Sequence, residues 1–337
     1  MQTETDRRGS SDPTPTVSVL VATRNHERTL GAMVEAVMGQ VVEGGLELIV
    51  IDDGSDDGTP ELLQRLAAGA RWPLLQVRLP ESQGPARARN LGLDRARGRF
   101  IAITDSDCVP APGWLQEALA AFSSPEVGVV QGRVAAISAA APLFSHYIET
   151  PEFDGTFCTS NVVYRREALA GLRFDHGCWY SGRLAGFLVS TSPPIGEDVD
   201  LGLRVLAAGW QARFCAGALV HHQIIPISPW RWLTWPLRYG CFPARVARYP
   251  QARRHLFLGV WVSPLQLAFE VALVGGLLAL WRPFALVLAL PYLVLFLRQR
   301  GLRGRFPPAK AAAHLGWDLV AFASLLLGSL RYRAVVL

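Results

Sequence analysis

Residues 17–59 read VSVLVATRNHERTLGAMVEAVMGQVVEGGLELIVIDDGSDDGT. Two apolar runs, at 17–23 and 46–53, enclose a stretch at 27–40 whose apolar residues recur at helical spacing, which predicts a strand, a helix and a second strand. The alternation continues with strand-like runs at 74–80, 99–107 and 127–134 and helix-like stretches at 59–69, 84–97 and 112–122. Strands that alternate with helices predict an α/β fold with a Rossmann-like, mostly parallel sheet and helices on both faces.

Polar side chains follow three of these runs at the point where each strand ends. They are Thr23, Arg24 and Asn25 after the first run, Asp52 and Asp53 after the second, and Asp105, Ser106 and Asp107 after the fourth. Ligands of such sheets bind beyond the carboxyl ends of the strands. The sequence therefore predicts a ligand site at this edge of the sheet.

The composition indicates a folded chain with a membrane-like part. Half of the 337 residues are apolar and only 18% are charged, against about 25% in an ordinary soluble domain. A disordered, collagen-like or low-complexity chain is excluded, and the length favours two units of roughly 150 residues each. The five cysteines stand apart with no Cys-x-x-Cys pair, so a reducing compartment is favoured over a disulfide framework or a zinc ribbon.

The chain divides into four segments by hydropathy and charge. Residues 1–15 are polar and are expected to form a disordered lead, without the apolar core of a signal peptide. Residues 16–225 carry the alternation of strands and helices. Residues 226–255 interleave tryptophans and tyrosines with arginines, which favours a lipid interface over a solvated basic helix or a nucleic-acid surface. The net charge of +5 lies largely near the apolar segments that follow, so membrane lipids rather than nucleic acid are the expected partner.

Residues 256–337 are expected to form transmembrane or interfacial helices. A hairpin at about 256–297 would have both ends in the cytoplasm, because arginines flank its outer sides, and Glu270 would face another helix or the lipid border. A third helix at about 309–330 would span the bilayer or lie in its interface, because His314 and Asp318 interrupt its apolar run. The alternative is a buried helical pair. The preferred interpretation is a multi-pass protein of the inner or plasma membrane.

Two acidic pairs could carry chemistry at the strand ends. On an extended segment, Asp105 and Asp107 would share a face and reach one divalent cation together with its bound phosphates. The alternative is a turn in which Asp and Ser cap the backbone locally. Asp53 could accept hydrogen bonds from a base or a ribose, and a plain loop and helix start would show the same residues.

Two further pairs lie downstream. Glu197 and Asp198 open a helical stripe, where the helix dipole alone would favour acidic residues, although a base at a helix entrance has the same pattern. His221 and His222 close a short apolar run and are either metal ligands or structural histidines. No Gly-x-Gly-x-x-Gly follows the first strand, and the single lysine, Lys310, belongs to no P-loop.

Taken in order, these segments resemble the family 2 glycosyltransferases, which have the GT-A fold of nucleotide-diphospho-sugar transferases. The similarity covers roughly residues 16–225, and its motifs follow one another in the right order and spacing. They are VSVLVATRN (17–25), IVIDDGSDDGT (49–59), GPARARNLG (84–92), RFIAITDSDC (99–108), SNVVYRREAL (160–169), RFD (173–175) and GEDVDLGLR (196–204).

The resemblance implies a binding site for a nucleotide-sugar donor, with a UDP-sugar favoured. Residues at the first strand end would cradle the nucleotide, and the second acid of the D-D-G-S segment would meet the base. An arginine would lie near the diphosphate, and the first acid of the D-x-D segment would contact the ribose or the metal, with the serine beside it. In this sequence these positions are Ala22, Thr23 and Arg24, then Asp53, Arg89, Asp105 and Ser106.

The resemblance also implies a metal site and a catalytic base. Asp107 would bind Mg²⁺ or Mn²⁺, and His222, preferred over His221, would complete the site. Asp198, with Glu197 beside it, would deprotonate the acceptor hydroxyl. A divalent ion would neutralise the diphosphate leaving group.

The expected function is therefore metal-dependent, inverting transfer of a sugar to a hydroxyl of a lipid-linked or saccharide acceptor at the cytoplasmic membrane face, in the synthesis of a glycolipid or a cell-envelope polysaccharide. The alternative is a catalytically idle scaffold that binds nucleotide sugar. The sequence departs from the family pattern by an insertion at 176–196, which is either an acceptor loop or a surface insertion, and by the lack of a clear Gln-x-x-Arg-Trp. The second departure disfavours a processive synthase.

Overall fold

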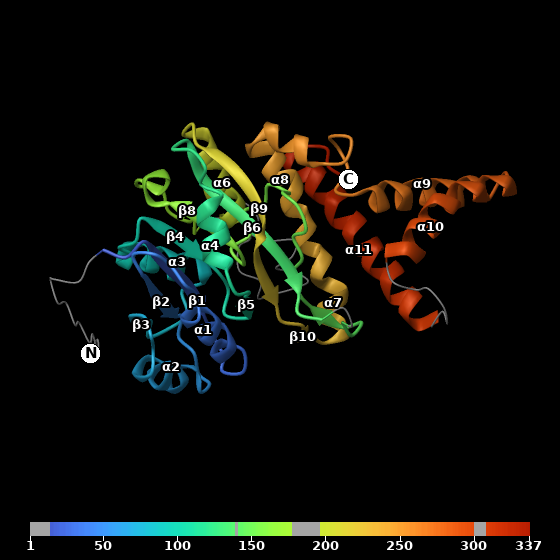
Figure 1. Cartoon of the computed structure of the whole chain (residues 1–337). Helices are drawn as coiled ribbons and strands as arrows, with labels where there is room; N and C mark the ends of the chain where they lie inside the picture. Colours follow the sequence, from blue (N-terminus) through green and yellow to red (C-terminus); the bar gives the residue numbers. More distant parts are fainter. Residues whose placement is uncertain (1–13, 139–140, 177–195, 300–307) are drawn as a thin grey trace. The chain divides into compact units, whose positions relative to one another are not determined.

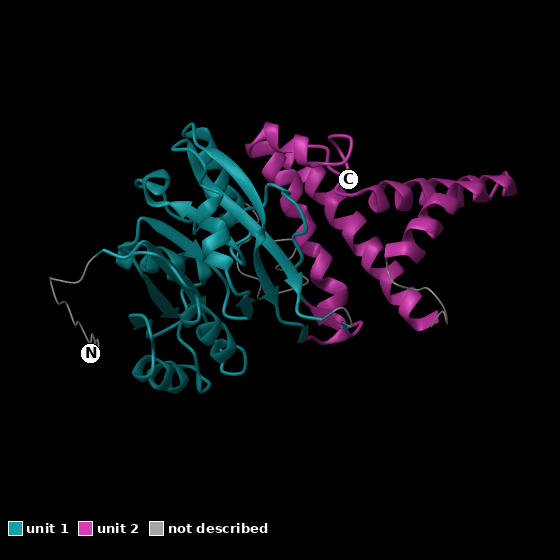
Figure 2. Ribbon diagram, in the orientation of Figure 1, with its two compact units in different colours: residues 1–141, 147–176, 197–225 teal, residues 142–146, 177–196, 226–337 magenta. Residues whose placement is uncertain are grey.

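The computed structural model describes residues 14–138, 141–176, 196–299 and 308–337. The predicted disordered lead and most of the insertion at 176–196 therefore lie outside the described residues. The chain forms two compact units (Figure 2): unit 1 comprises residues 1–141, 147–176 and 197–225, and unit 2 comprises residues 142–146, 177–196 and 226–337.

Unit 1 is built on an eight-stranded sheet with the order β3-β2-β1-β4-β8-β6-β9-β5 (Figure 1). The strands are β1 (Val17–Thr23), β2 (Leu46–Asp52), β3 (Leu74–Arg78), β4 (Phe100–Ile103), β5 (Cys108–Pro110), β6 (Val127–Ala136), β8 (Val162–Arg165) and β9 (Gln211–His222). Pairs β3–β2, β2–β1, β1–β4 and β6–β9 are parallel, whereas β8 runs antiparallel to both of its neighbours and β5 antiparallel to β9. The predicted mostly parallel α/β sheet is confirmed, with antiparallel strands added.

Helices cover both faces of the sheet because side chains alternate along each strand. Val17, Val19 and Val21 pack in one core with apolar residues of three helices, α1, α2 and α4. Leu20 points the other way and meets Gly92 of α3, where an added Cβ would lie 1.9 Å from a Leu20 methyl carbon. The helices of unit 1 are α1 (Leu30–Met38), α2 (Thr59–Ala68), α3 (Pro85–Arg95), α4 (Trp114–Ala120), η1 (Arg166–Leu169, a 3₁₀ helix) and α6 (Glu197–Ala207).

The run at 99–107 is not one strand. Strand β4 ends at Ile103, the backbone turns at residues 106–107, and Cys108 begins the separate strand β5. The turn is closed by the Cys108 amide, which donates to the Asp105 carbonyl at 3.1 Å. The prediction that Asp105 and Asp107 lie on an extended segment was therefore wrong, because Asp and Ser favour turns where an apolar run ends.

Unit 2 is mainly helical. Its helices are α7 (Pro229–Thr234), η2 (Trp235–Gly240), α8 (Cys241–Arg248), η3 (Pro250–His255), α9 (Pro264–Leu278), η4 (Pro283–Ala289), α10 (Leu290–Gln299) and α11 (Pro308–Tyr332). A short two-stranded sheet pairs β7 (Ser145–His146) with β10 (Ile225–Pro226).

The segment at 226–255 is partly core rather than wholly interfacial. Trp232 is 8% exposed, and its ring lies 5.2 Å from the His314 ring and 5.7 Å from the Phe144 ring. Trp230, by contrast, is 65% exposed. Mixed aromatic and basic residues predicted an interface, but the burial of Trp232 is explained by helix packing within unit 2.

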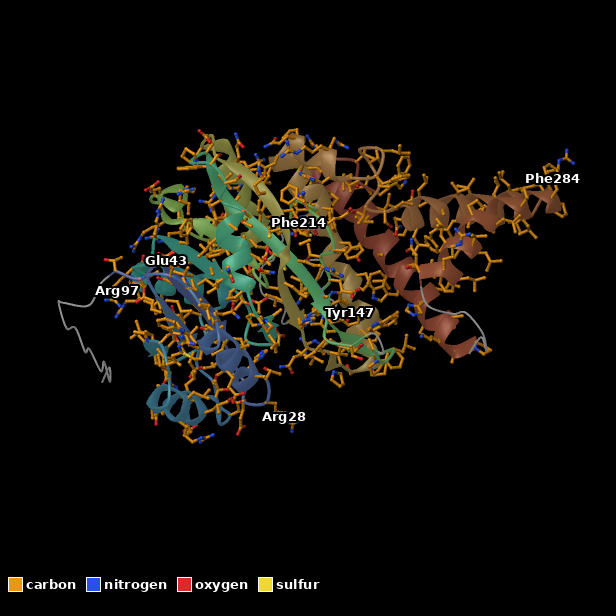
Figure 3. The ribbon with its side chains drawn as sticks, viewed as in Figure 1. Arg28, Glu43, Arg97, Tyr147, Phe214 and Phe284 are labelled. Atoms are coloured by element: carbon orange, nitrogen blue, oxygen red, sulfur yellow. The ribbon has the colours of Figure 1, made fainter. Side chains whose placement is uncertain are left out.

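Among the described residues, one helix is long and apolar enough to cross a bilayer, α11 with 25 residues. Helix α9 has only 15 residues, because residues 257–261 form a turn before it, and the apolar segment at 283–299 has 17. About 20 residues are needed to span the hydrocarbon core. The predicted multi-pass arrangement is thus not supported by these lengths. Figure 3 shows Phe284 at the outer end of the α9–η4 hairpin.

Gly54 is required where the chain leaves β2. Its φ is +70°, and a Cβ there would lie 2.8 Å from backbone atoms of Glu81 and Ser82. Both observations exclude a larger residue, since backbone atoms cannot move aside as a flexible side chain can.

We expect Gly54→Ala to destabilise the protein by about 1–3 kcal/mol and to lower its melting temperature. Gly31→Ala is the matched control, because its Cβ would meet nothing within 4 Å on helix α1, where alanine is favoured over glycine. Equal melting temperatures for the two variants would contradict the requirement.

Candidate functional site

The predicted strand-end residues meet at one edge of the sheet. Strand β1 lies between β2 and β4 in parallel register, so their carboxyl ends are neighbours. The Asp53 amide donates to the Thr23 carbonyl at 2.8 Å, and the Thr104 amide donates to the Leu20 carbonyl at 3.3 Å. The loops that carry Thr23, Asp53 and Asp105 therefore leave the sheet side by side.

Asp53 organises the loop before α3. Its carboxylate accepts hydrogen bonds from the Ser82 hydroxyl (2.7 Å) and from the amides of Gln83 (2.7 Å) and Gly84 (3.0 Å). The side chain is 5% exposed. A carboxylate has about four acceptor positions, so the predicted contact with a nucleotide base stays a prediction and would use the remaining one.

The other predicted nucleotide-binding positions follow β1. Thr23 is buried, and its hydroxyl has no hydrogen-bond partner among the residues that the structure describes. Arg24 is exposed and Ala22 partly so. The next residue, Asn25, has a φ of +58° and accepts a hydrogen bond from the Asp56 amide at 2.9 Å. This bond connects the β1 loop to the β2 loop.

Arg89 of α3 joins two acidic residues that are distant in the sequence. Its Nη2 lies 3.1 Å from Asp105 Oδ1, and its Nη1 lies 3.1 Å from Glu197 Oε1. The arginine is only 7% exposed. Burial alone lowers its pKa, but the carboxylates of Asp105, Glu197 and Asp198 outweigh burial, and the pKa of Arg89 is raised. The sequence motif predicted a functional Arg89 but not this bridge.

Ser160 completes the environment of Asp105. Its hydroxyl donates to Asp105 Oδ2 at 2.7 Å, and the residue is fully buried just before β8. Both oxygens of Asp105 are thus held by protein groups. Ser160 is a site residue that reasoning from the sequence missed, although it opens the SNVVYRREAL segment.

Asp107 and His222 belong to a group of donor atoms that could hold a metal ion. Their atoms and the Cys108 sulfur all lie within 4.8 Å of one another, and Asp107 Oδ1 is 3.7 Å from His222 Nε2. Burial raises the pKa of Asp107, although His222 opposes this shift. Oxygen and nitrogen donors fit a divalent cation, so the residues present are chemically suited to the expected metal.

Asp105 and His221 lie outside this donor group. His221 follows the alternation of β9 and points to the face opposite to that of His222, which explains why the two histidines cannot both reach one ion. Metal binding by Asp105 stays a prediction. Ser106, on the same turn, is 3% exposed.

Asp198 lies in the first turn of α6, beside Glu197. Burial, followed by the negative charge of Glu197, raises the pKa of Asp198 to about 7, although the Val199 amide and Arg89 oppose this shift. A carboxylate with a pKa near the working pH is suited to accept a proton. Cys158 shares this environment, and burial raises the pKa of its thiol to about 12.

Two family models match the chain. The model "Glycosyl transferase family 2" matches residues 18–181, and "Glycosyl transferase family group 2" matches residues 100–298. Among curated relatives, the pre-mycofactocin glycosyltransferase of Mycobacterium tuberculosis is 30% identical over 220 residues, which cover 61% of this chain and 42% of the relative. The chain spans about a quarter to three fifths of the length of the first curated relatives that it matches.

Solved structures show the same fold. The mannosyltransferase PcManGT from Pyrobaculum calidifontis, in complex with GDP-Man and Mn²⁺, aligns with a TM-score of 0.56 and 22% identity over 94% of this chain and 88% of that one. S. aureus TarS 1–349 in complex with UDP aligns with a TM-score of 0.51 and 17% identity over 94% and 91%. The sheet and its helices thus have the GT-A transferase fold. The second family model covers more than half of the chain, and the protein belongs to the family 2 glycosyltransferases.

We expect Asp198→Asn to raise the melting temperature at pH 8. An acid whose pKa is raised from about 4 in the unfolded chain to about 7 in the folded protein opposes folding increasingly as the pH rises through this window. The stabilisation should be full above pH 7 and should fade toward pH 4. Asp94→Asn, which removes an exposed carboxylate paired with Arg173, is the control and should not raise the melting temperature at pH 8. A pH-independent effect of Asp198→Asn would contradict the raised pKa.

Proposed function

We propose that this chain transfers a sugar from a nucleotide-diphosphate sugar to an acceptor hydroxyl, with inversion at the anomeric carbon and with Asp198 as the base. The observation that carries the proposal is the placement of Asp198. It opens α6 beside Glu197 and near the Arg89–Asp105 pair at the strand-end edge, and its pKa of about 7 suits proton transfer at neutral pH.

The reaction is a single displacement. The acceptor oxygen attacks the anomeric carbon, the bond from this carbon to the diphosphate oxygen breaks, and the acceptor proton passes to the Asp198 carboxylate. Glu197 is instead engaged in the ion pair with Arg89. No covalent sugar–enzyme species is formed, since one carboxylate and one displacement are sufficient.

Arg89 and the loops at the strand ends would hold the donor. The Arg89 Nε–H is buried and has no hydrogen-bond partner among the described residues, so it would reach a diphosphate oxygen only if neighbouring groups moved when the donor binds. The Thr23 hydroxyl is likewise buried without a partner among the described residues and would need the same kind of movement to contact the nucleotide. Ala22, Arg24, Asp53 and Ser106 remain proposed contacts of the donor.

A divalent cation, Mg²⁺ or Mn²⁺, would be held by Asp107 and His222, with Asp105 next to them. When bound, it would neutralise the charge that develops on the diphosphate. The Mn²⁺ in the PcManGT complex supports the use of a divalent cation, and the donor group at Asp107 and His222 supports its location. His222 is preferred over His221 because only His222 faces Asp107.

The proposed acceptor is a lipid-linked or saccharide hydroxyl at the cytoplasmic face of a membrane. Helix α11 supports membrane attachment by the way its polar and apolar residues are distributed between buried and exposed positions. Six of its polar and small residues are buried in unit 2, and five of its six leucines are exposed, whereas Leu325 is buried. The buried set is His314, Asp318, Ala321, Ser324, Gly328 and Ser329, and the exposed set is Leu315, Leu319, Leu326, Leu327 and Leu330. Small residues facing protein and leucines facing outward are typical of a helix packed within lipid.

The hairpin of α9 and η4 would add a second, shallow anchor. At its turn Leu280, Trp281 and Phe284 are each more than 70% exposed, and Arg282 lies between them. Buried in the acyl region, these side chains would give the anchor its affinity, while the arginine could reach a lipid phosphate.

Transfer is tested with a panel of UDP-, GDP- and dTDP-sugars and with lipid-linked and soluble acceptors in the presence of Mn²⁺. We expect Asp198→Asn to lower transfer by about 10²–10⁴-fold and to leave donor binding, measured by calorimetry, within about twofold. The wild-type rate should increase tenfold per pH unit below about pH 7, since the base must be ionised. Donor binding without transfer or hydrolysis by the wild type would favour the idle scaffold, and full transfer by the variant would remove the base assignment.

Membrane attachment is tested by flotation with vesicles. We expect the double variant Leu280→Glu and Phe284→Glu to bind vesicles less than the wild type, because two charges would enter the acyl region. Val41→Glu is the matched control, since Val41 is 70% exposed in unit 1. Equal flotation of the double variant and the control would contradict the hairpin anchor.

A further inference from the structure

We infer that the Cys108 thiol is a third protein ligand of the cation at Asp107 and His222, and that the site therefore prefers thiol-binding cations such as Zn²⁺ and Co²⁺ to Mg²⁺. This inference rests on the proposed function in one respect, namely that a cation binds at Asp107. The identity of the third ligand is a separate statement about this chain, and it can fail while the proposed function holds.

Strand pairing places the sulfur at the site. Cys108 is the first residue of β5 and lies directly opposite His222 of β9 in the antiparallel pair. Residues that face one another across such a pair project to the same face of the sheet. Asp107 immediately precedes Cys108 and brings its carboxylate to the same point from the turn. The three residues are thus joined by the backbone geometry and not by a chance meeting of long side chains.

The separations of the donor atoms suit ligands of one ion. Cys108 Sγ lies 3.8 Å from Asp107 Oδ1, Asp107 Oδ1 lies 3.7 Å from His222 Nε2, and all three atoms are within 4.8 Å of one another. Zinc binds sulfur at about 2.3 Å and nitrogen or oxygen at about 2.0–2.2 Å. In a tetrahedral arrangement, such bonds place neighbouring ligand atoms roughly 3.3–3.6 Å apart. Small movements would close the site around an ion.

His222 is oriented as metal-binding histidines usually are. Its Nδ1 lies 2.7 Å from the carbonyl oxygen of Gln223, so the Nδ1–H donates to this carbonyl. The protonated Nδ1 leaves Nε2 as the nitrogen with a lone pair, and Nε2 faces Asp107. A backbone carbonyl on the far nitrogen is a common outer partner of a metal-binding imidazole.

The burial of Cys108 is also compatible with a purely structural role in the apolar core. Cys108 is fully buried and belongs to the same apolar core as Trp114 and Val220. Its sulfur nevertheless lies beside the Asp107 carboxylate and belongs to the donor group. One carboxylate, one imidazole and one thiolate would leave coordination positions for diphosphate oxygens. On binding, the thiol proton would pass to solvent, and the two anionic ligands would balance the charge of a divalent ion.

Ligand chemistry then sets the metal preference. Thiolate ligands select softer or borderline ions, whereas Mg²⁺ requires oxygen ligands in an octahedral arrangement. A site with only Asp107 and His222 would also favour Zn²⁺ and Co²⁺ over Mg²⁺, because imidazole is a poor ligand for Mg²⁺, and the thiolate would strengthen this preference.

The test is a Co²⁺ titration of the full-length protein followed by absorbance, because a thiolate bound to Co²⁺ gives a near-ultraviolet charge-transfer band that oxygen and nitrogen ligands do not give. We expect the band in the wild type and its loss in Cys108→Ser. Cys158→Ser is the matched control. Its thiol is affected by Asp105 and by Asp198, but its sulfur is outside the donor group, and this variant should keep the band.

Affinity provides the second measurement. We expect Cys108→Ser to lose at least about tenfold in Zn²⁺ affinity by calorimetry with little change for Mg²⁺. If serine prevents folding, Cys108→Val keeps the apolar contacts in the core and serves instead. A wild type that binds Co²⁺ without the band, or a band that persists in the Cys108 variants, would overturn the inference. If the wild type shows Mn²⁺-dependent transfer but no band with Co²⁺, the assignment of Cys108 as a ligand is rejected and the proposed function is kept. If it shows the band but no transfer, the proposed function is rejected and the ligand assignment is kept.

Discussion

The bridge that Arg89 forms between Asp105 and Glu197 is the interaction on which the candidate site depends. It joins α3, the turn after β4 and the first turn of α6, which are far apart in the sequence. A buried guanidinium requires compensating charge, and two carboxylates buried without it would repel one another. The three segments are therefore held together by a requirement for charge balance, in addition to the packing of their apolar residues.

The same bridge gives the acidic residues of the site different environments. Asp105 is held by Arg89 and Ser160, and Glu197 by Arg89. Asp198 forms no ion pair with Arg89 in the described structure, lies beside negative charges and has a raised pKa. A carboxyl group whose pKa is raised toward neutrality is typical of acid–base sites. The neutralised pair sets the geometry, and the remaining carboxylate keeps the capacity to accept a proton.

The fold could be predicted from the sequence because each strand and helix has its own periodicity, and the ends of β1 and α2 fall where the pattern places them. Contacts between distant segments could not be predicted in this way. The Ser160–Asp105 bond and the Cys108–His222 pairing depend on how β8 and β5 enter the sheet. The hairpin was predicted to begin at about residue 256, but α9 begins at Pro264, because hydropathy alone does not reveal the turn before it. Trp232 was assigned to an interface because composition does not distinguish a ring in lipid from one in a helical core.

The antiparallel pairing of β5 with β9 also determines which histidine can serve the site. Side chains alternate at every residue of a strand, so a slip of β9 by one position would bring His221 opposite Cys108 and turn His222 to the other face. Either of the two adjacent histidines could supply an imidazole, and the pairing of β9 with both β5 and β6 determines which of them faces the site. A one-residue insertion or deletion near the end of β9 would bring His221 to the site in place of His222. The site would then still contain an imidazole.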